Sequence, residues 1–344
     1  MNAPETLIYP FAQIPAPGAC NEVAPGIYWV RMPLPFALDH INLWLLQDGD
    51  GWTIIDCGYG LPEVQTLWQK VFDSRLGGGT VKRIIATHYH PDHIGQSAWL
   101  TQHFELELWM PQAEFLTGHA VHRGEPGYNT ESICALFRRH GLDETHLNQI
   151  AARGNSYQKG VPALPHRYRR IMDNEIITID GKRWRVIMGY GHAPEHAALY
   201  CEELNVLISG DMILPRISTN VSVWPAEPEG DPLGLFLASI RHYAQLPADT
   251  LVLPSHGVVF RGLRKRVNDL ECHHEERLGE MRAACATPLT AAQLMQVLFK
   301  RELDSHQVFF AMGETIAHLN YLMHRGEVSR LQNAAGVYRF TRAL

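Results

Sequence analysis

The chain has 344 residues, which is enough for one large hydrophobic core and a smaller second domain. Its hydrophobic content of 46% and charged content of 19% are typical of a soluble globular enzyme. The formal net charge of −6 argues against any general attraction for nucleic acid or for an anionic membrane surface.

Strands and helices alternate in the first part of the chain. The predicted elements, in chain order, are strands over 26–30, 41–46 and 52–56, a helix over 62–72, a strand over 82–87, a helix over 94–103 and a strand over 106–109. This alternation is typical of an α/β or α+β fold.

The regular alternation of strands and helices stops over 118–170, where predicted helices such as 132–140 are mixed with glycine- and proline-containing loops. Long insertions of this kind often cover an active site, although a purely structural role is the alternative. Regular elements then return. They are strands over 175–179, 183–188, 197–201 and 205–209, a helix over 232–245 and a strand over 250–254.

A change of composition near 286–288 predicts a domain boundary. Beyond it we expect helices over 290–301 and 314–325 and a hairpin over 328–340. We therefore expect a catalytic domain over 20–285, with the insertion 118–170 as a candidate lid, and a small C-terminal domain over 286–344.

One short segment gathers potential metal ligands, and it reads Thr87-His88-Tyr89-His90-Pro91-Asp92-His93. If the preceding strand continues to Pro91, His88 and His90 share one face, with Cα atoms about 6–7 Å apart. Asp92 and His93 would follow where the chain leaves the strand. Imidazole and carboxylate groups suit zinc, iron or manganese. The alternatives are that His88 is an ordinary buried histidine and that Asp92 only caps a helix beginning at His93.

Three more ligand-type residues each follow an apolar strand and lie beside glycine, and they are His192, Asp211 and His256. Loops at the ends of strands are free to form a site because they need not fill a core. Each residue alone is a weak signal, since a single histidine or aspartate at a strand end is often only a hydrogen-bond partner. Together with the first motif they fit a site for two metal ions.

The order of these residues resembles the dinuclear form of the metallo-β-lactamase superfamily, whose Asp-x-Gly turn is similar to Asp56-Cys57-Gly58. The resemblance covers 26–260. It implies a four-layer αβ/βα sandwich with both metal ions at one edge. It does not identify a substrate, because the fold hosts many hydrolases.

The resemblance also implies a role for each ligand. His88, His90 and His192 would hold the first ion, Asp92, His93 and His256 the second, and Asp211 would bridge the two. Room remains for a shared hydroxide that attacks the substrate. Asp92 would also act in catalysis by orienting this nucleophile. His196 is either a supporting partner of the ligands or an ordinary histidine.

The expected reaction is metal-assisted hydrolysis of an ester or thioester of an acylated small molecule with an apolar part. The apolar side chains of the insertion motivate this choice. Lactonases of the superfamily carry a tyrosine shortly after the bridging aspartate, and residues 212–216 contain none. His90 replaces the glutamate of flavodiiron relatives. A mononuclear-iron sulfur dioxygenase, which shares most of the ligands, is a less favoured alternative.

The C-terminal residues resemble the winged-helix-like tail of the hydrolase subgroup that contains the lactamase-like protein 2 endoribonucleases. An endoribonuclease is therefore the alternative function. Residues 315–322 contain no lysine or arginine, so nucleic-acid binding is poorly supported, and a structural or dimer-forming role is preferred.

We expect two divalent metal ions, zinc first and iron or manganese as alternatives. The six cysteines include no C-x-x-C pair, so we expect free thiols. Residues 1–5 begin no signal peptide, and no apolar run approaches the ~20 residues of a membrane span. These observations favour a cytoplasmic protein without a membrane partner, and the dimer-forming role of the tail would make it a homodimer.

Overall fold

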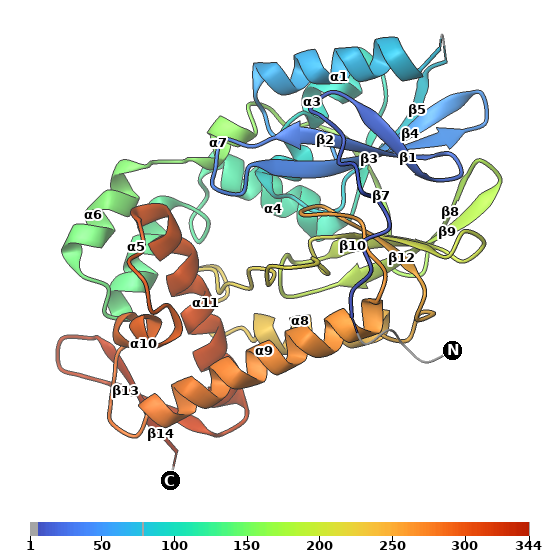
Figure 1. The fold of residues 1–344 in the computed structure, drawn as a ribbon. Helices are drawn as coiled ribbons and strands as arrows, with labels where there is room; N and C mark the ends of the chain where they lie inside the picture. Colours follow the sequence, from blue (N-terminus) through green and yellow to red (C-terminus); the bar gives the residue numbers. More distant parts are fainter. Residues whose placement is uncertain (1–5, 78, 344) are drawn as a thin grey trace. The chain divides into compact units, whose positions relative to one another are not determined.

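The computed structural model describes residues 6–77 and 79–343, which form two compact units (Figure 1). The first unit contains the chain up to His122 together with Tyr157–Thr219 and Ser239–Val267. The second contains Arg123–Ser156, Asn220–Ala238 and the chain from Asn268 onwards. Each unit is therefore built from segments that are far apart in the sequence.

The first unit contains a seven-stranded sheet in which the strands follow one another in chain order. Its strands are β1 (Cys20–Ala24), β2 (Ile27–Pro33), β3 (His40–Asp48), β4 (Gly51–Ile55), β5 (Val81–Ile85), β6 (Leu108–Met110) and β7 (Tyr168–Arg170). Pairs from β1 to β4 are antiparallel, and pairs from β4 to β7 are parallel. The change at β4 occurs because helical connections return the chain to the same end of the sheet.

A five-stranded sheet with the order β12-β11-β10-β9-β8 forms the second half of this unit. Its strands are β8 (Ile176–Ile179), β9 (Lys182–Gly189), β10 (His196–Cys201), β11 (Val206–Gly210) and β12 (Leu251–Pro254). Within this sheet, β11 and β12 pair in parallel and the other neighbours pair in antiparallel fashion. All residues of β10, β11 and β12 are buried, as expected for strands covered on both faces.

The core of the first unit lies between the two sheets. Trp29 and Trp44 of the larger sheet and Trp184 of the smaller one are at most 1% exposed within one hydrophobic cluster. Helices α1 (Pro62–Arg75) and α3 (Ser97–His103) cover the outer face of the larger sheet (Figure 1). The apolar face of α1 is buried there, with the Trp68 and Phe72 rings stacked. Packing thus fixes the strands and leaves their ends available for a site.

The helices that belong wholly or in part to the first unit also include α2 (Pro91–Ile94), α4 (Gln112–Arg123), α7 (Tyr157–Gly160), α8 (Pro232–Tyr243) and α9 (Leu263–Ala284). Helix α9 has 22 residues and was not predicted. Its residues are mostly charged or polar, so its sequence shows little of the apolar periodicity by which an amphipathic helix is recognised.

Besides the parts of α8 and α9 over 232–238 and 268–284, the second unit contains α5 (Thr130–Arg139), α6 (Glu144–Ala152), α10 (Ala291–Leu298), α11 (Ser305–His324) and the hairpin of β13 (Val328–Gln332) and β14 (Tyr338–Arg342). The hairpin and α10 lie close to their predicted positions. Helix α11 begins at Ser305 and not at residue 314 as predicted. Asp304 explains the difference, because its side chain accepts hydrogen bonds from the amides of His306 and Gln307 and forms a capping box.

The predicted division into domains at residue 286 stays a prediction. Residues 123–156 of the predicted lid belong to the second unit, and Tyr157 and the residues after it belong to the first. All six cysteines lie in the described chain and are free. Within residues 6–77 and 79–343, no helix is both long and apolar enough to cross a membrane. Residues 1–5, on which the prediction about a signal peptide rests, lie outside the described residues.

A buried asparagine connects the two sheets. The Asn42 side chain accepts a hydrogen bond from the Trp29 indole N–H at 2.8 Å. Its amide group donates to the carbonyl oxygens of Pro254 at 2.9 Å and Gly257 at 3.2 Å. Asn42 is fully buried, so water could not easily replace its side chain as a partner of these groups.

We predict that Asn42→Ala lowers the free energy of unfolding by about 2–4 kcal/mol, because it leaves several buried polar groups without partners. Urea denaturation monitored by tryptophan fluorescence measures this change. Gln69→Ala, on the exposed face of α1, is the control and should change stability by less than about 0.5 kcal/mol. Equal effects of the two substitutions would contradict the prediction.

Candidate metal centre

The His88–His93 segment lies at the end of β5, but it is not part of the strand. Strand β5 ends at Ile85. His90 is the N-cap residue of α2, which begins at Pro91, a residue whose fixed φ suits the first helical position. The prediction that strand alternation brings His88 and His90 together is therefore wrong, as is the alternative that Asp92 is an N-cap. A loop followed by one helical turn presents these side chains.

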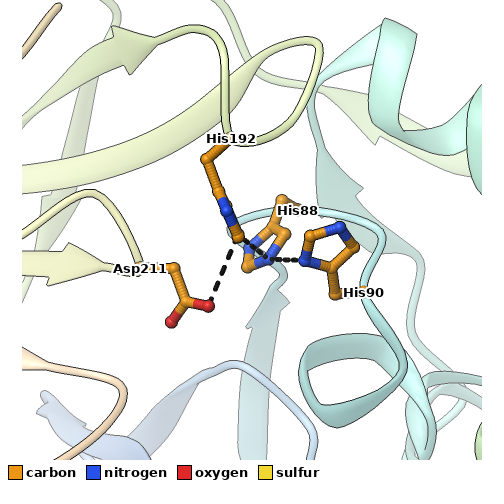
Figure 2. Close-up of side chains that lie close together, drawn as sticks. All are labelled: His88, His90, His192 and Asp211. Atoms are coloured by element: carbon orange, nitrogen blue, oxygen red, sulfur yellow. Dashed lines mark hydrogen bonds and ion pairs between the residues drawn. The ribbon is translucent and has the colours of Figure 1, made fainter. Parts of the chain in front are cut away.

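The first cluster contains His88, His90, His192 and Asp211, with one potential ligand atom of each within 4.8 Å of the others (Figure 2). His88 Nε2 lies 2.9 Å from His90 Nδ1 and 3.2 Å from His192 Nε2. Asp211 Oδ2 lies 3.4 Å from His192 Nε2. Three ring nitrogens and one carboxylate oxygen thus converge on one point.

The second cluster contains Asp92, His93 and His256. Asp92 Oδ2 lies 3.3 Å from His256 Nε2 and 3.7 Å from His93 Nε2. Asp211 faces this cluster with its other oxygen, because Oδ1 is 3.5 Å from His93 Nε2 and 3.4 Å from His256 Nε2. Asp211 thus lies between the two clusters, with one oxygen toward each.

The strand ends explain why residues far apart in the sequence meet. His192 follows β9, Asp211 follows β11 directly, and His256 follows β12. In the smaller sheet β11 is the neighbour of β12, and β10 lies between β11 and β9. His88 follows β5 of the larger sheet, so the site is formed by residues at the ends of strands from both sheets.

The protonation preferences of these residues fit cation binding. Burial, followed by the nearby His192, lowers the pKa of His90 to about 3, so that its ring is neutral and can donate a nitrogen lone pair. Burial also lowers the pKa of His256, but Asp211 and Asp92 outweigh this effect and raise it to about 10. The two carboxylates therefore create a local field that favours positive charge.

Two buried atoms give an independent test of this fit. Among the described residues, several buried polar atoms have no hydrogen-bond partner, and two of them, His93 Nε2 and Asp211 Oδ1, face each other in this site at 3.5 Å. Such atoms are costly to bury unless something binds them. Because both are ligand atoms of the usual kind for divalent transition metals, the residues present fit such ions.

Asp56 orients the ligand segment, and its side chain was not predicted as part of the site. Its carboxylate accepts hydrogen bonds from the Thr87 amide at 2.7 Å and the Thr87 hydroxyl at 3.0 Å. Its Oδ2 also lies 2.8 Å from His93 Nδ1, which fixes that ring with Nε2 toward the cluster. Asp56 has a φ of 62°, in the left-handed region that aspartate tolerates. The Asp56-Cys57-Gly58 turn was the signal that could have identified it.

His196 lies inside the molecule and next to the ligands. Its Nε2 accepts a hydrogen bond from the Asp211 amide at 3.1 Å, and its ring centroid is 4.8 Å from that of His88. It contacts the backbone of the shared aspartate and is fully buried. This placement is compatible with the predicted supporting role.

A comparison with protein families identifies the fold. Residues 37–256 match the model of the metallo-beta-lactamase superfamily. The chain belongs to this superfamily. Residues 278–343 match a further model, described as the C-terminal domain of metallo-beta-lactamase-like proteins. The predicted family and its sandwich of sheets flanked by helices are confirmed, and the chain is a metallo-hydrolase of this superfamily.

Solved structures and curated relatives agree with this assignment. A beta-lactamase domain protein from Burkholderia ambifaria is 48% identical, with 98% of each chain covered and a TM-score of 0.92. A metallo-beta-lactamase family protein from Thermus thermophilus is 33% identical, with 93% of this chain and 100% of that chain covered and a TM-score of 0.78. The probable metallo-hydrolase YqjP of Bacillus subtilis is 26% identical over 306 residues, which cover 85% of this chain and 91% of the relative.

We predict that Asp56→Asn weakens zinc binding at the second cluster by about 10- to 100-fold. Asparagine keeps the left-handed backbone, but its amide N–H₂ group would face His93 Nδ1 and force that ring into the tautomer whose Nε2 carries the proton. Competition with a chromophoric chelator measures the affinity. Asp73→Asn, on the exposed face of α1, is the control, and equal affinities in both variants would contradict the prediction.

Proposed function

We propose that this metallo-hydrolase cleaves an ester or thioester of an acylated small molecule that has an apolar part, with two divalent ions held by the two clusters. The observation that carries the proposal is Asp211, which faces both clusters with different oxygens. An arrangement of this kind suits a pair of cations separated by one carboxylate.

A relative supports the choice of a thioester. An enzyme of Aspergillus fumigatus named atrochrysone carboxyl ACP thioesterase is 22% identical over 244 residues. The match covers 70% of this chain but only 43% of that relative, so the full activity of the relative does not transfer. Its name nevertheless favours thioesters as the first substrates to test on this chain.

Separate sets of residues would hold the two ions. His88, His90 and His192 would hold the first ion and Asp92, His93 and His256 the second, with Asp211 shared. When bound, divalent ions polarise the reacting carbonyl group and lower the pKa of water, and zinc is our first choice, with iron or manganese as alternatives.

Asp92 is the residue to which we assign the orientation of the attacking water molecule. The Asp92 side chain is 18% exposed and can contact an attacking water molecule, whereas the His93 side chain is fully buried. Burial raises the pKa of Asp92, but the charge of His93 and the hydrogen bond to His256 outweigh this effect and lower it. The carboxylate therefore stays ionised and can hold the water molecule in position by accepting a hydrogen bond from it.

The test is a substrate panel of acyl-CoA thioesters, aryl esters, a lactone and single-stranded RNA, assayed after loading with Zn²⁺, Mn²⁺ or Fe²⁺. We predict metal-dependent hydrolysis of the thioesters or aryl esters. His88→Ala should lower it by about 100-fold or more, because it removes a ligand from the first cluster. His166→Ala, an exposed histidine, is the matched control and should keep full activity.

Removal of metal gives the second part of this test. Dialysis against a chelator should abolish turnover, and returning two equivalents of the metal should restore it. Cleavage of RNA that His88→Ala abolishes, with no turnover of esters, would support the endoribonuclease alternative. One iron per chain with uptake of oxygen would instead indicate a sulfur dioxygenase, and either result would contradict the proposal.

A further inference from the structure

A buried glutamate lies behind the first cluster and contacts both of its histidine-bearing loops. Glu114, in the first turn of α4, is fully buried. Its Oε2 accepts a hydrogen bond from the Tyr89 amide at 2.9 Å, and its Oε1 accepts one from the Glu195 amide at 2.5 Å. One carboxylate thus joins two segments that are separated by more than a hundred residues in the sequence.

The two amides belong to the segments that carry the histidines of the first cluster. Tyr89 is the residue between His88 and His90, and Glu195 lies between His192 and His196. All three histidines of the first cluster are thus within three residues of an amide that Glu114 binds. Among the hydrogen bonds of the described residues, none joins Glu114 to the second cluster, where His93 is instead held by Asp56.

Two further hydrogen bonds make the arrangement rigid. The Glu195 carboxylate accepts a hydrogen bond from the Ala113 amide at 3.0 Å, so α4 and the His192 loop are joined in both directions. Amides in the first turn of a helix lack a partner within the helix, and this bond satisfies one of them. The Tyr157 hydroxyl donates to the Tyr89 carbonyl oxygen at 2.6 Å. Tyr89 is therefore held at both its N–H and its C=O.

We propose that Glu114 is a positioning residue, which holds the His88–His90 loop and the His192–His196 loop at the separation that metal binding at the first cluster requires. The proposal rests on the proposed function, because it assumes that the first cluster binds a metal ion. Burial of a carboxylate is unfavourable unless its hydrogen bonds are worth more than its lost hydration. Both Glu114 oxygens accept hydrogen bonds from backbone amides of the ligand loops, so the buried carboxylate holds these loops together.

The critical variant is Glu114→Gln. The amide N–H₂ group of the glutamine must face one of the two backbone N–H donors. One loop therefore loses its hydrogen bond, while the volume of the side chain stays the same. We expect zinc affinity at the first cluster to fall by about 10- to 100-fold, with the second cluster changed by less than about threefold. Competition with a chromophoric chelator measures both affinities, and repeating the titration in a His256→Ala background assigns the weakened position to the first cluster.

Glu314→Gln is the matched control, because Glu314 is a largely covered glutamate of α11 that is hydrogen-bonded to Asn220 and belongs to the second unit. It should leave both zinc affinities unchanged. Cobalt substitution adds a spectroscopic readout, since a disturbed ligand arrangement changes the visible absorption bands of Co²⁺. Unchanged zinc affinities and cobalt spectra in Glu114→Gln, or an equal loss at both clusters, would overturn the proposal.

If Glu114→Gln does not fold, Glu114→Asp takes its place, because its shorter side chain cannot reach both the Tyr89 amide and the Glu195 amide. The same selective loss at the first cluster is then expected, by about threefold or more, and unchanged affinity would contradict the proposal.

Hydrogen exchange of the metal-free protein separates this inference from the proposed function. Exchange over 88–90 and 192–196 should be faster in Glu114→Ala than in the unaltered protein, with 255–257 unchanged. If the unaltered protein binds no metal, the proposed function fails, while unchanged exchange over both loops would show that Glu114 does not hold them.

Discussion

The Asp211 carboxylate is the contact on which the arrangement of the site depends. It presents Oδ2 to His192 and Oδ1 to His93 and His256, and it therefore sets the separation of the two clusters. Largely buried carboxylates that lie close together, such as Asp92 and Asp211, are unfavourable without compensating positive charge. The site therefore suits cations, and a rigid frame holds its ligands in place.

The frame consists of the two packed sheets and of three buried polar residues. Asn42 ties the loop before His256 to the larger sheet, Asp56 fixes Thr87 and His93, and Glu114 joins the loops of His88 and His192. The side chain of each residue makes hydrogen bonds with several buried polar groups. Hydrogen bonds of this kind add specificity because, in a low-dielectric interior, a missing partner is costly.

The chemistry of the site could be predicted from the sequence more readily than its geometry. The spacing of His88, His90, Asp92 and His93 is unusual enough to indicate metal ligands, and each remaining ligand follows an apolar strand. The expected strand alternation was nevertheless wrong, because Pro91 starts a helical turn and the strand ends at Ile85. Helix α11 extends beyond its prediction because a capping box at Asp304 outweighs the weak apolar pattern before residue 314.

The sequence by itself determined the kinds of ligand, their order along the chain and the alternation of strands and helices, because these follow from local residue patterns. The family resemblance already implied that Asp211 is shared, whereas only the tertiary structure decided which side chains support the ligands. Glu114 shows the reason: in the sequence it is one acidic residue in the first turn of a helix. Its partners at 89 and 195 become its neighbours only when two sheets and a helix pack together.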